Sequence, residues 1–190
     1  MKKVDTTNDI IVIDIETTGI DINTSEIIGI SAVVLQSQKV TGLKYETWCQ
    51  ATQKIDKKAL EIIGKKAGYF EDQPLLSDAI INLSDFINNR RVVASNPRFC
   101  TEFLYKSGLS STIKFEDPLD IVKKKLDGFA PYDYEDYSWS DWIKGPLQRL
   151  LPCCYHLNDD FDTMLIAKFL EILFNNNLRA QLESIDCYDD

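Results

Sequence analysis

The sequence predicts an α/β domain with a five-stranded mixed sheet, three antiparallel strands followed by two parallel ones, and helices on both faces. Three β-branched segments come first, 10–19, 26–35 and 41–49, and short polar connections join them. Consecutive strands joined in this way pair antiparallel. Helical segments then alternate with two later strands, 91–95 and 113–117. A helix followed by a strand is typical of a crossover, which places strands parallel in one sheet.

The first strand carries two acids in an otherwise apolar run. Its sequence is IIVIDIETTG, with Asp14 and Glu16 among isoleucines. Positions i and i+2 of a strand point to the same face, so the two carboxylates would project side by side. A charge in a buried strand costs several kcal/mol unless it is paired, and hard oxygen ligands suit Mg²⁺ or Mn²⁺. The residues therefore predict a divalent-cation site. The alternative is a strand end with two solvent-facing acids.

The strand is broken by three residues that could meet a ligand, namely Thr17, Thr18 and Gly19. A glycine lets a ligand approach the backbone closely, and the hydroxyls and N–H groups of a turn can bind a polar substrate end. An ordinary turn is the alternative interpretation.

Two helices are predicted between the third and fourth strands. The first covers 55–63 and begins near Asp56, and the second covers 77–88 with Ser77 as its cap. The second helix has an apolar face made of Ile80, Ile81, Leu83, Phe86 and Ile87.

The second half of the chain predicts three further helices and a loop. Pro118 is suited to the first position of a helix running to Leu126. Residues 127–141 are acidic and aromatic, and their apolar residues show no regular spacing, which indicates a surface loop. Residues 142–151 indicate a short helix. The last helix lies within 155–173, and its apolar residues recur every four positions as Phe161, Leu165, Phe169 and Leu173.

Length and composition favour one globular domain. The chain has 190 residues, of which 44% are hydrophobic and 27% charged, which suits a single core over 10–176 between a flexible N-terminus, 1–9, and an acidic tail, 177–190. No apolar run approaches the span of a bilayer, and the N-terminus lacks the apolar core of a signal peptide. We therefore expect a cytoplasmic protein without a membrane partner. The five cysteines lack metal-ligand spacing and fit reduced thiols.

The net charge of −9 argues against a protein that grips long duplexes through a basic surface. A nuclease that holds only the last few nucleotides through metal ions needs few cations of its own. Short or single-stranded nucleic acid is therefore the expected kind of substrate, if the chain acts on nucleic acid.

The pattern DxETTG after an apolar strand resembles the first motif of the DEDD superfamily of 3′-to-5′ exonucleases, in particular its histidine branch, which includes proofreading epsilon subunits. The second motif of that family is an Asn, two variable residues, a Phe and an Asp. Asn96 and Phe99 match it, whereas Cys100 takes the place of the acid.

The third family motif has a His in a loop and a metal-binding Asp that opens the last helix. His156 and Asp160 resemble it, although three residues separate them where the family usually has four. Tyr155 does not fit the spacing of the tyrosine branch either. The alternatives from the residues alone are that the acids Asp159 and Asp160 cap a helix and that His156 is structural.

The resemblance implies a ribonuclease H-like fold and hydrolysis of single-stranded DNA or RNA from the 3′ end, releasing mononucleotides. It implies two divalent ions, Mg²⁺ or Mn²⁺, about 4 Å apart, one acidifying the attacking water and the other stabilising the leaving oxygen. By this resemblance, Asp14 would bridge both ions, Glu16 and Asp160 would hold the ion that carries the nucleophile, and His156 would be the general base. Thr17, Thr18 and Gly19 would lie against the 3′ nucleotide, and Ile20 would pack on its base. Asn96 and Phe99 would belong to the substrate site.

The two departures from the family pattern leave a second hypothesis open. Cys100 is expected beside the metal site, with its sulfur where a carboxylate oxygen would otherwise lie. A neutral thiol is a poor ligand for a hard cation. The chain could therefore be a degenerate domain that binds nucleic acid or a protein partner without cleaving, since a fold does not secure its function when the site is altered.

Overall fold

The structure is a computed structural model and describes residues 9–94, 96–125 and 163–174. Several predictions lie outside these ranges. They are the end of the fourth strand at Ser95, the loop 127–141, the helix 142–151, and the residues Tyr155, His156, Asp159, Asp160 and Phe161, together with both chain ends.

The sheet has five strands, β1 (Ile10–Thr17), β2 (Ile27–Gln36), β3 (Lys39–Trp48), β4 (Arg91–Ala94) and β5 (Phe115–Glu116). Their order is β3-β2-β1-β4-β5. β1 pairs antiparallel with β2, and β2 antiparallel with β3. β4 runs parallel to both β1 and β5. The predicted mixed sheet is confirmed.

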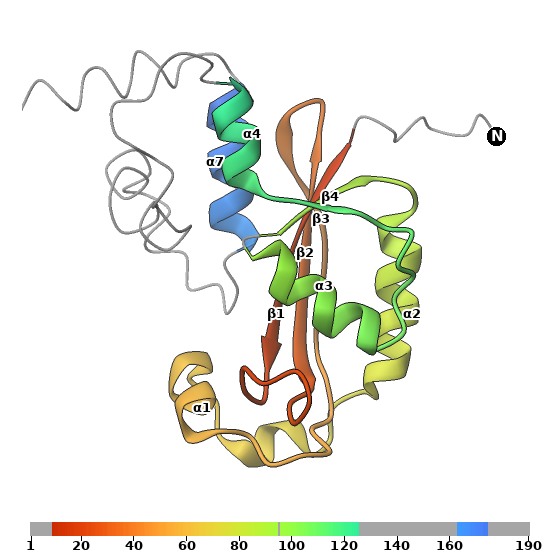
Figure 1. Ribbon diagram of the computed structural model, residues 1–190, viewed down its shortest axis with the longest axis vertical. Helices are drawn as coiled ribbons and strands as arrows, with labels where there is room; N and C mark the ends of the chain where they lie inside the picture. The colour runs from red at the N-terminus through yellow and green to blue at the C-terminus, as the bar shows by residue number, and fades with distance from the viewer. Residues whose placement is uncertain (1–8, 95, 126–162, 175–190) are drawn as a thin grey trace, which may run out of the picture.

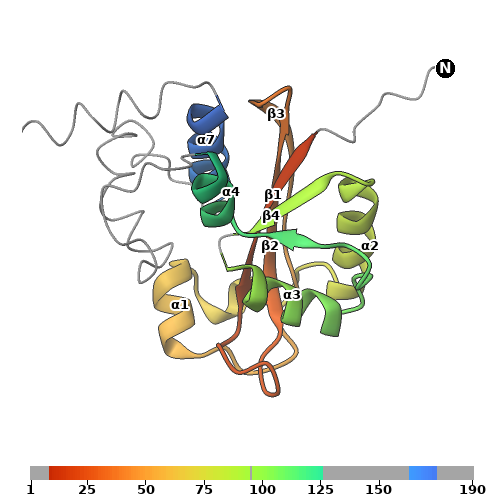
Figure 2. The same ribbon diagram turned by 45° about the horizontal axis from the view of Figure 1, so that its top comes forward.

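Helices cover both faces of this sheet (Figures 1 and 2). α2 (Leu76–Ile87) and α3 (Pro97–Lys106) lie on one face, and α4 (Pro118–Lys125) and α7 (Thr163–Phe174) lie on the other. Pro118 is the first residue of α4, as its place after β5 predicts. No helix in the described part of the chain is both long and apolar enough to cross a bilayer.

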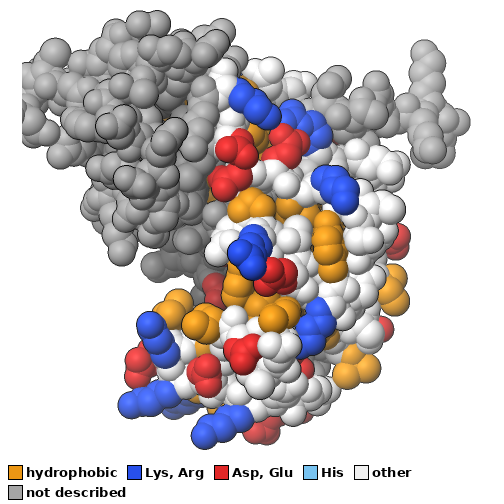
Figure 3. All heavy atoms as spheres, in the orientation of Figure 1, with side chains coloured by type: hydrophobic (Ala, Val, Ile, Leu, Met, Phe, Trp, Pro, Cys, Tyr) orange, Lys and Arg blue, Asp and Glu red, His pale blue; other side chains and the backbone are white. Residues whose placement is uncertain are grey.

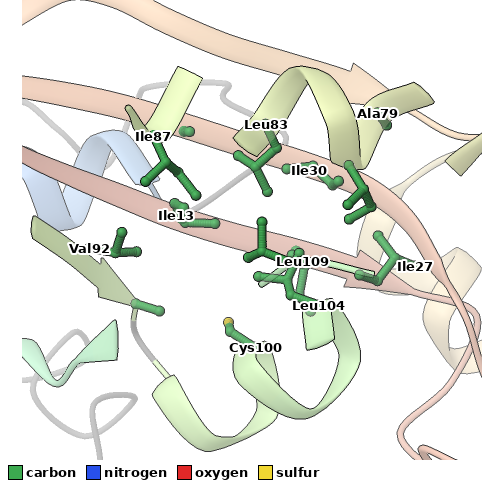
Figure 4. Packing of buried hydrophobic residues seen from close by; sticks show 14 of the residues in the cluster. Ile13, Ile27, Ile30, Ala79, Leu83, Ile87, Val92, Cys100, Leu104 and Leu109 are labelled. Carbon is green, nitrogen blue, oxygen red and sulfur yellow. The ribbon is translucent and has the colours of Figure 1, made fainter. Parts of the chain in front are cut away.

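Strand alternation divides the core into two layers. Ile11, Ile13 and Ile15 of β1 pack with α2 and α3, and Figure 4 shows part of this layer. Ile10 and Val12 point to the other face and pack with the buried side of α7. Each face of β1 is thus buried over its first four residues, and the acids follow directly after them.

A third cluster closes the end of the sheet where β1 terminates. It joins α1 (Lys57–Ile63) and a short 3₁₀ helix, η1 (Ala67–Phe70), to the ends of β2 and β3, and α1 is seen at the bottom of Figure 1. Its buried members are Ile28, Trp48, Ile55, Ile63 and Phe70. The α1 helix follows Asp56 as predicted, whereas η1 was not expected from the sequence.

Two details of α2 and one of β5 differ from the prediction. Ser77 does not cap α2, because the helix begins at Leu76 and its N-cap, Leu75, makes no side-chain cap bond. Ile81 is 61% exposed, since it lies off the buried stripe of the helix. β5 is only two residues long, because the Ile113 N–H donates to the Ser110 carbonyl in a turn instead of joining the sheet.

Candidate active site

Asp14 and Glu16 lie on one face of β1, near its carboxyl end. Both are half-buried, and they alternate with the buried Ile13 and Ile15, which point to the opposite face. The face that carries the two acids is the same one that Ile10 and Val12 bury against α7. The two carboxylates are therefore placed side by side, at the point where the apolar layer under α7 ends.

The first residue of α7 also lies at this point. Ser31 of β2 is the cross-strand partner of Asp14, and its hydroxyl is 2.8 Å from the hydroxyl of Thr163. Both side chains are buried. This bond joins residues 132 positions apart in sequence, and it fixes the start of α7 beside the row that holds Asp14.

The turn after β1 is held by its own hydrogen bonds. Thr17 donates from its hydroxyl to the Gly19 carbonyl at 2.6 Å. The Thr18 N–H donates to the Glu26 carbonyl, and the Glu26 N–H donates back to the Thr18 hydroxyl at 3.1 Å. The Asp56 N–H donates to the Thr18 carbonyl at 2.8 Å. The two threonines thus fix the shape of the turn.

Gly19 lies close to the side chains of its neighbours. A Cβ built on it would lie 2.5 Å from an Asp56 carboxylate oxygen and 2.8 Å from the Ser25 hydroxyl. The next residue, Ile20, is 88% exposed and is the most exposed large apolar side chain in the described part of the chain. The turn therefore combines a tightly packed backbone with an apolar side chain that faces solvent.

Glu26 is a structural residue of the site region that sequence reasoning missed. Its carboxylate accepts hydrogen bonds from the N–H groups of Thr52 at 2.6 Å and Gln53 at 2.7 Å, and from the Thr52 hydroxyl at 2.7 Å. These bonds join the segment after β3 to the segment that holds the Thr18 turn. No local sequence signal identifies such partners, because they lie 26 and 27 positions away.

Asn96 and Phe99 open α3. Asn96 is exposed and is the N-cap, and its side-chain oxygen accepts from the Phe99 N–H at 3.1 Å. The half-buried Phe99 ring lies 4.7 Å from the Phe103 ring, measured between centroids. In this structure both residues shape the first turn of the helix that carries Cys100.

Cys100 is buried between α3 and the sheet, with 1% of its surface exposed (Figure 4). Burial is the main cause that raises the pKa of its thiol, and the negative charge of Asp14 raises the pKa further. The sulfur is thus near enough to Asp14 to feel its charge, and at neutral pH it is a thiol rather than a thiolate.

Within the ranges that the structure describes, no three His, Cys, Asp or Glu side chains gather into a group that could hold a metal ion. Two half-buried carboxylates on one strand face fit a hard divalent cation, whereas the neutral Cys100 thiol does not add to that donor set. His156 and Asp160, the other predicted members of the site, lie outside the described residues.

A family model described as an exonuclease, RNase T, matches residues 11–180 of the chain. The chain belongs to the RNase T exonuclease family. This family consists of 3′-to-5′ exonucleases, so the predicted resemblance is confirmed at the level of the family.

Several polymerase proteins are similar in sequence. The DNA polymerase III PolC-type protein of Thermotoga petrophila is 31% identical over 94 residues, which are 50% of this chain and 7% of that protein. The DNA polymerase III epsilon subunit of Buchnera aphidicola subsp. Schizaphis graminum is 28% identical over 117 residues, which are 58% of this chain and 50% of that subunit. The epsilon subunit of Salmonella typhimurium is 26% identical over 132 residues, covering 62% of this chain and 54% of that subunit. The chain therefore spans about half, or less, of these relatives.

Solved structures share the fold. E. coli Exonuclease I in complex with a dT13 oligonucleotide matches with a TM-score of 0.63 and 13% identity, over 91% of this chain and 42% of that one. Another structure of exonuclease I matches with a TM-score of 0.65 and 12% identity, over 96% of this chain and 44% of that one. These matches show that the chain has the ribonuclease H-like exonuclease fold.

Proposed function

We propose that this chain is a metal-dependent 3′-to-5′ exonuclease that removes mononucleotides from single-stranded DNA or RNA ends. The observation that carries the proposal is the convergence at the end of β1. Asp14 and Glu16 share one face there, and the Ser31–Thr163 hydrogen bond brings the start of α7 to the same row.

The chain just before α7 supplies the remaining acid in this proposal. Asp160 precedes Thr163 by three residues. Consecutive Cα atoms are about 3.8 Å apart, so the two Cα atoms are within about 11 Å of each other. This short connection would allow Asp160 to reach Asp14, whereas six residues lie between His156 and Thr163 and constrain the position of the histidine less.

Each residue has a separate task in the reaction. Mg²⁺ or Mn²⁺, when bound, would acidify the attacking water and stabilise the leaving oxygen. Asp14, Glu16 and Asp160 would hold the cations, and His156 would take the proton of the water, which suits its ordinary pKa. Thr17, Thr18 and Gly19 form the turn that would lie against the 3′ nucleotide, and the exposed Ile20 offers its base an apolar contact.

The surface charge fits a short or single-stranded substrate better than a long duplex. On the face shown in Figure 3, Lys and Arg side chains are interspersed with Asp and Glu. A duplex-binding protein would gather its cations into a stripe along the phosphates. Binding would thus depend on the cations of the site and on the 3′-terminal nucleotides.

Cys100 is the feature that would limit this activity. Its neutral thiol supplies no negative charge to the site, so the second cation would be held weakly. We therefore expect Mn²⁺ to support more activity than Mg²⁺ and turnover to be low. The same feature favours the second candidate function, a domain that binds nucleic acid or a protein partner without cleaving it.

The test is the digestion of a 5′-labelled single-stranded oligonucleotide, as DNA and as RNA, with Mn²⁺ or Mg²⁺. We expect a ladder that shortens from the 3′ end in the parent and no ladder in Asp14→Ala. Asp85→Ala is the matched control, because it removes an exposed acid of α2, on the other face of the sheet. An inactive parent that still binds the oligonucleotide would support the non-catalytic candidate.

A further inference from the structure

Three residues form a row across the sheet at the level of Glu16. Glu16 on β1 is paired with Gly29 on β2, and Gly29 is paired with Trp48 on β3. Residues directly opposite in neighbouring strands point to the same face. Gly29 has no side chain, so the outer two members of the row can approach each other across it.

The Trp48 ring fills the space above Gly29. A Cβ built on Gly29 would lie 2.7 Å from Cζ3 and 2.8 Å from Cε3 of that ring, and 3.1 Å from the Cβ of Glu16. The two contacts with the ring are shorter than real Cβ atoms show, so a side chain at position 29 would have to displace the Trp48 ring. The indole and the stem of Glu16 therefore flank the same point in space, and the ring forms a wall beside the acid.

The Trp48 ring is held in place on its other side by residues of the α1–η1 segment. Trp48 is only 8% exposed, and its ring meets Phe70 edge-on at 5.6 Å and 74° and Tyr69 at 6.0 Å and 85°. The Lys65 ammonium lies 5.1 Å from the Trp48 ring centroid and 5.2 Å from that of Tyr69. The segment from the end of α1 through η1 thus clamps the indole. An indole clamped on two sides has little freedom to change rotamer.

A β-bulge places the acid at this wall. Glu16 is paired with Gly29 but Thr17 with Ile27, which leaves Ile28 as an extra residue in β2. Ile28 is fully buried in the same cluster as Trp48 and Phe70. A bulge re-aims the side chains next to it, and bulges are frequent beside active sites.

We propose that Trp48 is a positioning residue for Glu16, and that the α1–η1 segment sets the divalent-cation affinity of the site through this ring. The inference rests on the proposed function, because it assumes that Glu16 is a cation ligand. A glutamate side chain can choose among three staggered wells at each of its first two torsions. The Trp48 ring excludes torsion angles at which the Glu16 carboxylate would point away from the cation. Glu16 therefore loses less conformational entropy when the cation binds.

The size of the effect follows from the number of wells. If one Glu16 torsion becomes free to sample all three staggered wells, cation binding weakens about threefold. If two torsions become free, it weakens about ninefold. Trp48→Leu removes the wall and leaves an apolar side chain in the cluster. Gly29→Ala forces the ring and the Glu16 stem apart. Both variants should weaken binding by this factor at a temperature where they remain folded.

The experiment measures the Mn²⁺ dissociation constant of the full chain from the electron paramagnetic resonance signal of free Mn²⁺. Gly42→Ala is the matched glycine control, since a Cβ on Gly42 meets nothing within 4 Å. Leu83→Ala is the stability control, because Leu83 is fully buried in the other core layer. We expect both controls to bind within about twofold of the parent, although Leu83→Ala lowers the melting temperature.

The possible outcomes separate the two proposals. If Trp48→Leu lowers the melting temperature but binds Mn²⁺ as the parent does, Trp48 is merely structural and the inference is wrong. If the parent binds Mn²⁺ no better than Asp14→Ala, the cation site of the proposed function is wrong, and this inference falls with it. Circular dichroism reports folding. Should Gly29→Ala not fold, Trp48→Leu decides alone.

Discussion

Replacing Cys100 by aspartate should make the fold of this chain depend on a divalent cation. The thiol is 1% exposed, and burial and the charge of Asp14 both raise its pKa. The same surroundings would oppose a second carboxylate. An uncompensated buried charge costs about 3–5 kcal/mol. For a chain of this size each kcal/mol corresponds to about 2–4 °C, so Cys100→Asp should melt about 6–20 °C below the parent without metal.

A cation held between Asp14 and the new carboxylate should reverse much of this loss. Mn²⁺ at a hundred times its dissociation constant stabilises the folded state by about 2.7 kcal/mol, which returns about 5–11 °C. Mg²⁺-dependent exonuclease activity should also rise about tenfold or more, if the restored charge contact is worth about 1.4 kcal/mol in the transition state. Adding Asp14→Ala should abolish that gain.

The assay is thermal unfolding at pH 7.5 with and without Mn²⁺, with Cys100→Asn as the control of equal shape and no charge. The pKa of the new carboxyl group should be raised in the folded state, so its destabilising effect grows as the pH rises above the ordinary value for Asp and shrinks in acid. If Mn²⁺ raises the melting temperature of Cys100→Asp no more than that of Cys100→Asn, the new carboxylate does not bind the cation. Position 100 would then not face the site.

Three further variants test other parts of the structure. Gly19→Ala should raise the KM for an oligonucleotide about fivefold, worth about 1 kcal/mol, because its Cβ would strike the Asp56 carboxylate, whereas steady-state kinetics of Gly42→Ala should not change. Burial, with a smaller effect from a neighbouring acid, raises the pKa of the Cys49 thiol to about 12. The unfolded thiol ionises first, so between pH 8 and pH 10.5 urea unfolding should show that the parent loses about 2 kcal/mol more than Cys49→Ala. Phe169→Ala should lower the free energy of unfolding by about 3–5 kcal/mol, because this fully buried side chain packs α7 on the sheet.

The parts of the fold that depend on local pattern could be predicted from the sequence. Alternation in the first strand places Asp14 and Glu16 together, because that periodicity is a property of any extended chain. Pro118 marks the start of α4 because its ring suits the first helical position. The first two family motifs could be recognised for the same reason, since their residues lie on β1 and at the start of α3.

Features that depend on distant partners could not be predicted. Glu26 is one acid among many in the sequence, and only the folded chain brings the N–H groups of Thr52 and Gln53 to it. Gly29 lies in a strand without any turn signal, and its role follows from Trp48, its partner on the neighbouring strand β3. Ser77 has the chemistry of a cap, but the helix begins one residue earlier, so the side chain falls inside the first turn.

The most direct test of the proposed cation site is the rate of 3′-label release from a single-stranded oligonucleotide in Mn²⁺, measured for Asp14→Ala, Glu16→Ala and the double variant. Residues that act as one unit are non-additive, because removing either one already disables the unit. We predict that each single variant falls to the background rate and that the double variant falls no further. Release by Asp14→Ala at the rate of the parent would show that Asp14 does not hold a catalytic cation.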